Sequence, residues 1–378
     1  MPLRTEPLPE FQRSGLLQLT PAVACSRGGT ACFNPRRSAA THSNRASRPE
    51  YRRPAGEPFG DNATNRTVAA AVSNNLSNSN KSLQVRRVID VPLREVSGIC
   101  LRRGRAGRMS ILAVGDHAAK VAWFSPPRND EGRITWHTSN IAKLSGSLLP
   151  RRDSQIEAVC ADGRGRVLLL QETPPRVELV DLKGPKVVAS IDLVVEGDAR
   201  IARAWSRPKG SRGEGMALLP EGHLLVAKEK KPAALIEFGP ANARSRGLVR
   251  GGALPDGKLW PIKEGGHRFV ALATWLPDQA LAKNCADFSD LEIGPDGRLY
   301  LLSDKSATIA RLDDLPAGGG TAALLNVWRL GDVDGKPEGL AFNARGYAIV
   351  GLDTRKPHRN LILLEPAIAQ VRGRERKV

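Results

Sequence analysis

The chain has 378 residues, of which 41% are hydrophobic, so it can bury the core of one large domain or two ordinary ones. It contains no apolar run of about 18 residues, which argues against a membrane-spanning helix. The net charge of +18 would suit nucleic acid, but Lys and Arg are dispersed and aromatic residues make up only 4% of the chain. We therefore do not expect nucleic-acid binding.

Residues 1–83 are rich in Ser, Asn, Arg, Pro and Ala, as in the tract from Ser73 to Ser82. Such a composition buries too little apolar surface to offset the entropy of ordering, so it predicts a disordered, basic tail. The apolar stretch from Gly15 to Cys25 has two alternative explanations. It is either a signal sequence with Cys25 as a lipid anchor, which would export the protein to the periplasm or beyond, or part of a start assigned too far upstream.

From residue 84 to residue 366 the sequence alternates apolar and polar residues, with regular turn signals, and one pattern occurs five times. A first strand is followed by a turn, then by second and third strands, and in most repeats by a fourth. The first strands are VSGIC from Val96, IEAVC from Ile156, GEGMA from Gly213, FSDLE from Phe288 and PEGLA from Pro337. Units of about 50 to 60 residues with four strands are typical of a β-propeller.

We therefore predict an all-β, five-bladed β-propeller, expected to be a monomer. The last repeat lacks a fourth strand, because residues 367–378 form only a short basic tail, and the run from Leu83 to Val91 can supply it and close the ring. The interval between the third and fourth repeats is 75 residues, so a degenerate sixth blade between Gly239 and Asp287 is the alternative.

In a propeller, the start of each first strand and the end of each second strand lie on the same rim of the central channel. Here both positions are acidic. Second strands end in Asp116, Glu172, Glu229, Asp304 and Asp353, and first strands begin with Glu157, Glu214 and Glu338, or with Ser97 and Ser289.

Carboxylates that converge on one rim repel each other unless a cation, a lysine or protonation relieves the charge. Calcium takes six to eight oxygen ligands in flexible geometry, whereas magnesium needs a tighter octahedron, so calcium is the better candidate. The predicted metal ligands are Glu157, Glu172, Glu214, Asp304, Glu338 and Asp353, and Asp116, Glu229, Lys228 and Trp205 are predicted to contact a bound ligand. The alternative is structural: such acids can accept backbone hydrogen bonds in turns or clamp one blade to the next.

Other catalytic patterns are weak. The sequence has no GxSxG, P-loop or HExxH motif. His117 follows Asp116 on the predicted rim and is the candidate general base. The five cysteines lack metal spacing, so we expect neither a disulfide framework nor a zinc site.

Three segments resemble known repeats: EGMALLPEGHLLVAKEKKPAALIEF, FSDLEIGPDGRLYLLSDKSATIARL and PEGLAFNARGYAIVGLD. They are similar to repeats of the bacterial SdiA-regulated family of β-propellers and of the related phytase-like (esterase-like) domains. The resemblance covers about residues 90–365, and VAKEKKP, from Val226 to Pro232, is its most specific piece. It implies a five- or six-bladed propeller, often exported, with bound calcium and no firmly established reaction.

Calcium-dependent lactonases of the gluconolactonase type are similar in blade layout, but Ser289 stands where their motif has Asn. We expect the acidic rim to bind a divalent cation and, through it, a small molecule or a protein partner. The alternative function is a metal-dependent hydrolase of an ester, lactone or phosphate ester at the same rim.

Overall fold

A computed structural model describes residues 82–103, 109–125, 134–150, 154–163, 165–207, 211–255, 258–331 and 333–367. All of them belong to one compact unit. Residues 1–81, with the predicted signal sequence and Cys25, and residues 368–378 lie outside this part of the chain. No helix in the described ranges is long and apolar enough to span a membrane.

Two of the sheets have four strands each. The first follows chain order, and consists of β3 (Val96–Arg103), β4 (Met109–Gly115), β5 (Ala118–Phe124) and β6 (His137–Asn140). The second combines the two ends of the chain: β20 (Lys336–Phe342), β21 (Tyr347–Asp353) and β22 (Leu361–Pro366) are followed by β2 (Val85–Ile89). β2 pairs antiparallel with β22, and Val88 lies opposite Ile362.

A third sheet joins two further sets of four strands. One set is β7 (Ile156–Ala161), β8 (Arg166–Gln171), β9 (Arg176–Asp181) and β10 (Lys186–Val194). The other is β11 (Gly213–Leu218), β12 (Leu224–Lys228), β13 (Ala234–Pro240) and β14 (Gly265–Pro277). The outer strands β10 and β14 pair in parallel, which joins the two sets, and the short strand β18 (Gly320–Ala322) pairs with β14.

The fourth sheet contains β15 (Asp290–Ile293), β16 (Leu299–Ser303), β17 (Thr308–Leu312), β19 (Leu324–Leu330) and β1 (Ser82–Leu83). β1 corrects the predicted tail boundary at residue 84, because Leu83 is buried beside Leu330 and Ser82 pairs with Arg329. Its two residues are too few to show a strand pattern in the sequence.

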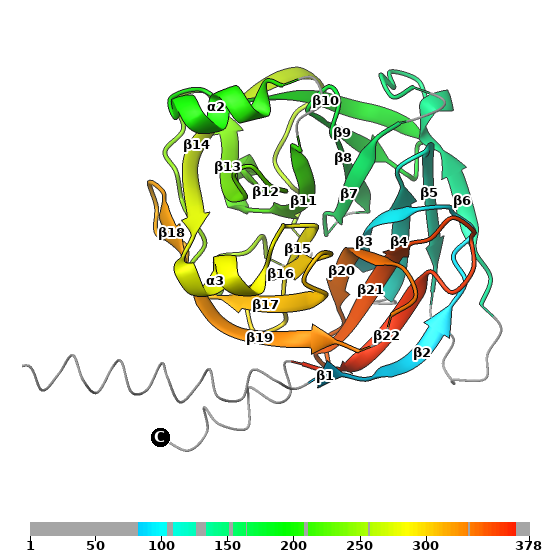
Figure 1. Ribbon diagram of the computed structural model, residues 1–378. Coiled ribbons are helices and arrows are strands. Elements are labelled where there is room, and N and C mark those ends of the chain that lie inside the picture. The colour runs from blue at the N-terminus through cyan, green and yellow to red at the C-terminus, as the bar shows by residue number, and fades with distance from the viewer. Residues whose placement is uncertain are drawn as a thin grey trace, which may run out of the picture. The chain divides into compact units, whose positions relative to one another are not determined.

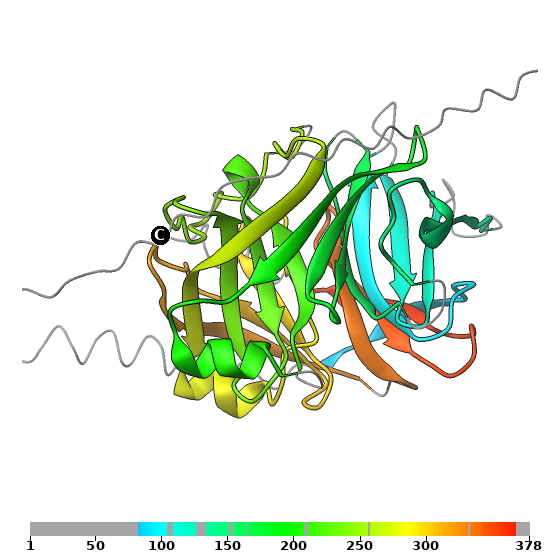
Figure 2. The same ribbon diagram turned by 90° about the horizontal axis from the view of Figure 1, so that it is seen from above.

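The strands are arranged around a common centre, so the described chain is mostly β and propeller-like (Figure 1). β3, β7, β11, β15 and β20 are innermost, and each contacts the next around the ring, with β20 contacting β3 again. Two short helices, α2 (Ala199–Trp205) and α3 (Gln279–Asn284), lie on one face of the ring (Figure 2). Apart from the end of β13, β14, α3 and an isolated bridge between Leu248 and Leu315, the described residues between Gly239 and Asp287 form no further strand.

The core lies between neighbouring sheets, because strands such as β8, β12, β16 and β17 bury residues on both faces. Leu170 of β8 and Val226 of β12 belong to one buried cluster, together with Phe238 and Trp260. Trp275 belongs to the next cluster around the ring. Burying both faces of a sheet against its neighbours is what holds a propeller together, since a sheet of this size is not stable alone.

Candidate functional site

The inner strands share a local irregularity near their first residues. In β3, β7, β11 and β20 the pairing with the second strand skips one residue, and the skipped residues are Ser97, Glu157, Glu214 and Glu338. In β15 the Ser289 N–H donates to the Leu302 carbonyl at 2.9 Å while Asp290 also lies opposite Leu302. A β-bulge places two residues opposite one and re-aims the side chain there. The predicted first-strand positions are therefore bulges.

The residue after each bulge lies where two inner strands approach closely. A Cβ on Gly98 would lie 2.8 Å from the Ala158 Cα, and a Cβ on Gly215 would lie 2.6 Å from the Leu291 backbone nitrogen. A Cβ on Gly339 would lie 3.0 Å from the Ile99 backbone nitrogen. These approaches bring the bulged positions of neighbouring strands toward one another at the same end of the ring.

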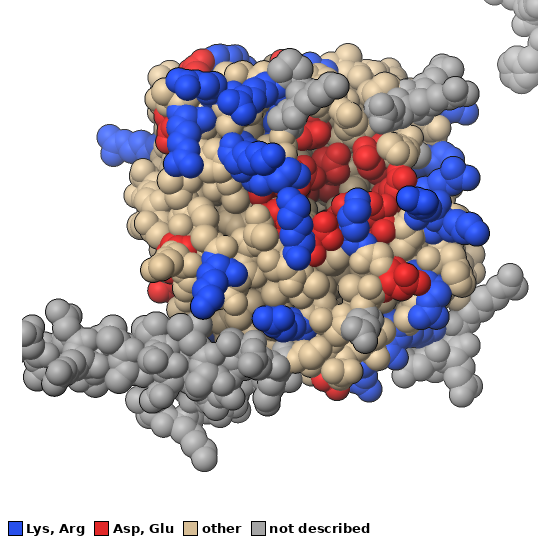
Figure 3. All heavy atoms as spheres, viewed as in Figure 1, with Lys and Arg blue, Asp and Glu red and all other residues tan. Residues whose placement is uncertain are grey.

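The second strands end beside these bulges, as predicted. Asp116, Glu172, Glu229 and Asp304 directly follow β4, β8, β12 and β16, and Asp353 is the last residue of β21. Acidic side chains gather over the centre of the ring on this face, and basic side chains surround them (Figure 3). We call the eight carboxylates of this face the acidic mouth; they belong to Asp116, Glu157, Glu172, Glu214, Glu229, Asp304, Glu338 and Asp353.

Glu157 and Glu214 are the least compensated members of the acidic mouth. Burial raises the pKa of both carboxyls well above the usual range, and neighbouring carboxylates raise it further, Asp116 most for Glu157 and Glu157 most for Glu214. Both residues keep some contact with solvent, although protein atoms enclose almost all of the space around their carboxyl groups. Such an environment is expected inside a channel. Within the described ranges, neither carboxylate has a hydrogen bond or an ion pair.

Other acids of the mouth have protein partners. Glu172 Oε1 accepts a hydrogen bond from the Arg212 backbone N–H at 2.9 Å, yet burial still raises its pKa. Lys336 Nζ lies 2.9 Å from Asp353 Oδ2 and 3.9 Å from Glu338 Oε1. Burial and the charge of Asp353 nevertheless raise the pKa of Glu338 to about 8. Asp304 differs, because its carboxylate has no hydrogen bond or ion pair among the described residues. Burial and the charge of Asp287 raise its pKa, against the opposing charges of Lys336 and Lys305.

Lys228 lies beneath the mouth and is not its counter-ion. The side chain is buried, and its Nζ donates to the carbonyls of Ser211 and Lys230 at 2.7 and 2.5 Å. Burial lowers its pKa to about 8, against the opposing effect of Glu229. Glu229 instead pairs with Lys230. The expectation that Lys228 contacts a bound ligand has no support in this geometry, because its Nζ is bonded to two backbone carbonyls.

The two serines of the series bind the backbone. Ser97 Oγ donates to the Ile156 carbonyl, and Ser289 Oγ accepts from the Asp304 N–H at 2.9 Å. The sequence interpretation missed Asp290, which is buried and accepts hydrogen bonds from the backbone N–H groups of Leu340 and Leu291 at 2.6 and 2.8 Å. This carboxyl connects β15 to β20, so it has the structural role, clamping neighbouring strands together, that was the alternative to metal binding.

His117 lies within a second group at the edge of the mouth. Its Nε2 is 2.7 Å from Glu95 Oε2, and its Nδ1 is 3.8 Å from Asp116 Oδ2. In the described part of the chain this is the only trio of potential metal ligands whose atoms all lie within 4.8 Å of one another. Glu95 was missed, because it precedes β3 and the equivalent residues of the next two repeats, Gln155 and Arg212, are not acidic.

Trp205 requires a correction. It ends α2 with its side chain buried, its Nε1 donates to the Leu193 carbonyl at 3.2 Å, and its ring packs 5.3 Å from that of Phe238. The indole therefore belongs to the core. Trp205 is the last residue of α2, and the helix turns this apolar side chain inward.

A separate cavity of about 430 Å³ lies at the other ends of the inner strands, and its lining includes Cys100, Cys160 and Glu292. The two thiols are free and buried, and burial raises the pKa of both. The pKa of Glu292 is raised by burial to about 8. This cavity lies apart from the acidic mouth, because these three residues lie in the second halves of the inner strands, whereas Glu157, Glu214 and Glu338 lie near the beginnings of theirs.

No family model matches the chain, and no curated protein matches it. The structure is similar to the glutaminyl cyclase of Myxococcus xanthus, with 12% identity, a TM-score of 0.43 and coverage of 76% of this chain and 97% of that one. It is also similar to a streptogramin B lyase, with 10% identity, a TM-score of 0.34 and coverage of 75% and 97%. A third similar structure is virginiamycin B lyase from Staphylococcus aureus, with 11% identity, a TM-score of 0.32 and coverage of 71% of this chain and 67% of that one. Likeness at this level carries no argument about activity, and membership of the SdiA-regulated family stays a prediction.

Proposed function

We propose that the acidic mouth binds a divalent cation, calcium in preference to magnesium, and through it a small ligand or a protein partner. The observation that carries this proposal is the pair Glu157 and Glu214. Both carboxyls lie at one end of the ring, where burial and neighbouring carboxylates raise their pKa values, and Glu157 is the carboxylate that raises the pKa of Glu214 most. Neither has a hydrogen bond or ion pair among the described residues. Buried acids without partners are costly, so their presence favours a ligand that compensates them.

Three compensations are available in principle: a proton, a lysine or a metal cation. The nearby lysines are already engaged, because Lys228 donates to carbonyls, Lys230 pairs with Glu229 and Lys336 pairs with Asp353. Protonation removes the repulsion but leaves Glu157 and Glu214 as buried acids without partners. A divalent cation neutralises two carboxylates at once and supplies the missing partner.

The geometry favours calcium. The central acids come from different strands and, in the described chain, no three of them bring their oxygens within 4.8 Å of one another. Long glutamate side chains can converge on a large ion with irregular coordination, whereas magnesium needs a compact octahedron. We assign Glu157, Glu172 and Glu214 as the main ligands, with Glu338 beside them. Asp304 and Asp353 complete the predicted metal set at its edge, and Asp116 and Glu229 stay candidates for contact with the bound ligand.

The same proposal includes the finer fold. We infer a five-bladed propeller in which each innermost strand begins one blade and β2 supplies the outer strand of the last blade by pairing with β22. Closure of this kind fixes the first and last repeats together, which keeps Glu338 and Asp116 on the same rim.

Thermal unfolding with calcium, with magnesium and with EDTA tests the proposal. A ligand that binds only the folded state at 100 times its Kd stabilises it by about 2.7 kcal/mol. We expect calcium to raise Tm by several degrees and magnesium to raise it less. The Glu157→Gln/Glu214→Gln double variant should lose this response, whereas Glu365→Gln on the outer strand β22 should keep it. An unchanged Tm of the unmodified protein in calcium would contradict the proposal.

The alternative function is a metal-dependent hydrolase that cleaves an ester, lactone or phosphate ester. The specific observation in its favour is the contact between His117 and Glu95, because a carboxylate beside an imidazole can orient it for proton transfer. A bound cation would polarise the carbonyl or phosphoryl oxygen. Screening aryl esters, lactones and aryl phosphates tests this alternative. Turnover should fall at least tenfold in His117→Ala and in Glu338→Gln. Equal turnover by the variants and the unmodified protein would show that the acidic mouth has no catalytic role.

A further inference from the structure

A second cavity lies beside the acidic mouth and has the opposite charge. Its volume is about 560 Å³, within the range of small-molecule pockets. It lies between α2 and the turn that follows β12. Its lining includes Arg200, Arg203, Arg207, Lys231, Pro232 and Ala204. We call it the arginine pocket.

The three arginines are presented to the pocket by one short segment. They are separated by three and four residues, so Arg200 and Arg203 share a face of α2 and Arg207 continues it just beyond the helix end. All three side chains are exposed, as is that of Lys231. Like charges at this spacing destabilise a helix, so neither helix formation nor the core explains their presence.

None of these four cationic groups is neutralised by the protein. Within the described ranges, no hydrogen bond or ion pair joins their charged ends to another residue. The acids nearest in sequence are engaged elsewhere: Asp198 caps α2 by accepting from the N–H groups of Arg200 and Ile201, and Glu196 pairs with Arg268. The pocket therefore holds four positive charges that have no counter-charge among the residues that the structure describes.

Hydrogen bonds of Arg212 connect the arginine pocket to the acidic mouth. Arg212 Nη2 donates to the Arg207 carbonyl at 2.6 Å, while the Arg212 backbone N–H donates to Glu172 Oε1 at 2.9 Å. On the other side, Lys231 follows Lys230, which pairs with Glu229. Basic side chains lie over α2 next to the acidic centre (Figure 3). A ligand held by the arginines would therefore lie next to the mouth.

We propose that the arginine pocket binds the phosphate group of a small organic molecule. Guanidinium groups match the tetrahedral phosphate oxygens with paired N–H donors, and several of them together suit a dianion better than a single carboxylate does. The volume leaves room for an organic part beyond the phosphate. The apolar lining is limited to Pro232 and alanines, so this part is polar, such as a sugar, and not a stacked aromatic base.

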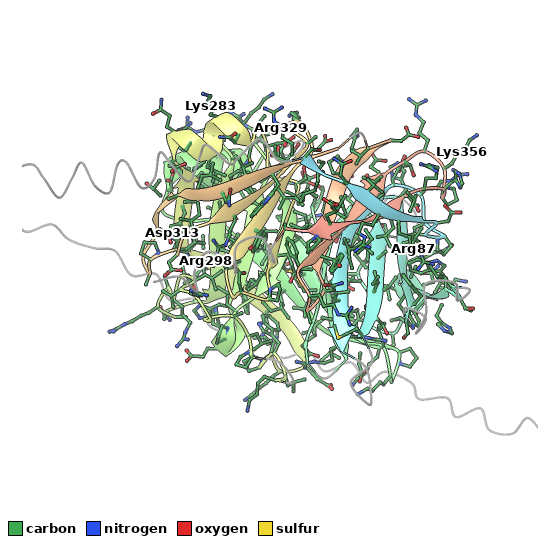
Figure 4. All side chains as sticks on the ribbon, turned by 90° about the horizontal axis from the view of Figure 1, so that it is seen from below. Arg87, Lys283, Arg298, Asp313, Arg329 and Lys356 are labelled. Carbon is green, nitrogen blue, oxygen red and sulfur yellow. The ribbon has the colours of Figure 1, made fainter. Side chains whose placement is uncertain are left out.

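This inference goes beyond the cation proposal and does not depend on it. Binding is measured by calorimetry in EDTA, with pyrophosphate and ribose 5-phosphate as probes at constant ionic strength. The pocket variant is Arg200→Gln/Arg203→Gln. The matched control, Lys283→Gln/Arg329→Gln, removes the same charge from α3 and β19, where both side chains are labelled in Figure 4. Circular dichroism confirms that each variant is folded, which is expected for exposed side chains.

The expected result is saturable binding by the unmodified protein, weakened at least tenfold in the pocket variant and less than twofold in the control. Two results would overturn the inference: no saturable binding of either probe, or equal weakening in both variants, which would indicate a general effect of net charge. Because no divalent cation is present, either failure leaves the calcium titration as an independent result.

Discussion

Replacing Glu338 by Gln should stabilise the calcium-free protein at alkaline pH. In the folded protein burial raises the pKa of this carboxyl to about 8, whereas in an unfolded chain it is about 4.3. The folded state therefore holds a proton that the unfolded state has lost. Stability from this group is fully present below the unfolded pKa and is lost as pH rises toward 8.

The magnitude follows from the size of the shift. At pH 7 the difference corresponds to about 3–4 kcal/mol by proton linkage. The side chain is 28% exposed and lies near Lys336, so solvent screening reduces the expected effect to roughly 2 kcal/mol. Glutamine has nearly the same shape and cannot ionise, so Glu338→Gln removes the loss of stability that ionisation of this carboxyl causes.

Urea unfolding at pH 4.5, 6, 7 and 8, in EDTA and in calcium, measures the effect. In EDTA the variant and the parent should be equally stable at pH 4.5, and the variant should be more stable by roughly 2 kcal/mol at pH 7 and by more than that at pH 8. In saturating calcium the order should reverse, because the variant has lost a ligand charge. A variant that is less stable in EDTA at pH 8, with the same pH dependence as the parent, would refute the reasoning.

Three further predictions concern the mouth and its supports. Glu157→Gln/Glu214→Gln should weaken calcium binding at least tenfold in calorimetry, and unaltered affinity would contradict the ligand assignment. Gly215→Val should destabilise the protein by at least ~2 kcal/mol in urea unfolding, since a Cβ there would lie 2.6 Å from a backbone nitrogen. The control is Gly266→Val, where a Cβ meets nothing within 4 Å, and equal effects would contradict the close-approach argument. Trp205→Ala should cost about 3–5 kcal/mol, because the indole is buried, and leave calcium affinity within twofold.

The repeats could be predicted from the sequence because each strand has a strong local signal. Alternation of apolar and polar residues, with turn residues at regular intervals, is fixed by the geometry of a strand and its turn. The acids at the ends of the second strands follow from the same geometry. Asp353 and Glu172 are found where that rule places them.

The rest depended on interactions between distant segments. The bulges at Glu157 and Glu214 arise where neighbouring inner strands meet, so no local pattern indicates them. The contact of Glu95 with His117 and the burial of Trp205 likewise depend on tertiary packing. The arginine spacing at α2 is visible in the sequence, but its meaning depends on the cavity beside it.

The most direct measurement is a crystal structure of the protein grown in calcium, with anomalous data to identify the ion. The account predicts an anomalous peak between the carboxylates of Glu157, Glu172 and Glu214, with those side chains rotated toward it. A mouth that contains only water in saturating calcium, with the three carboxylates still apart, would contradict it.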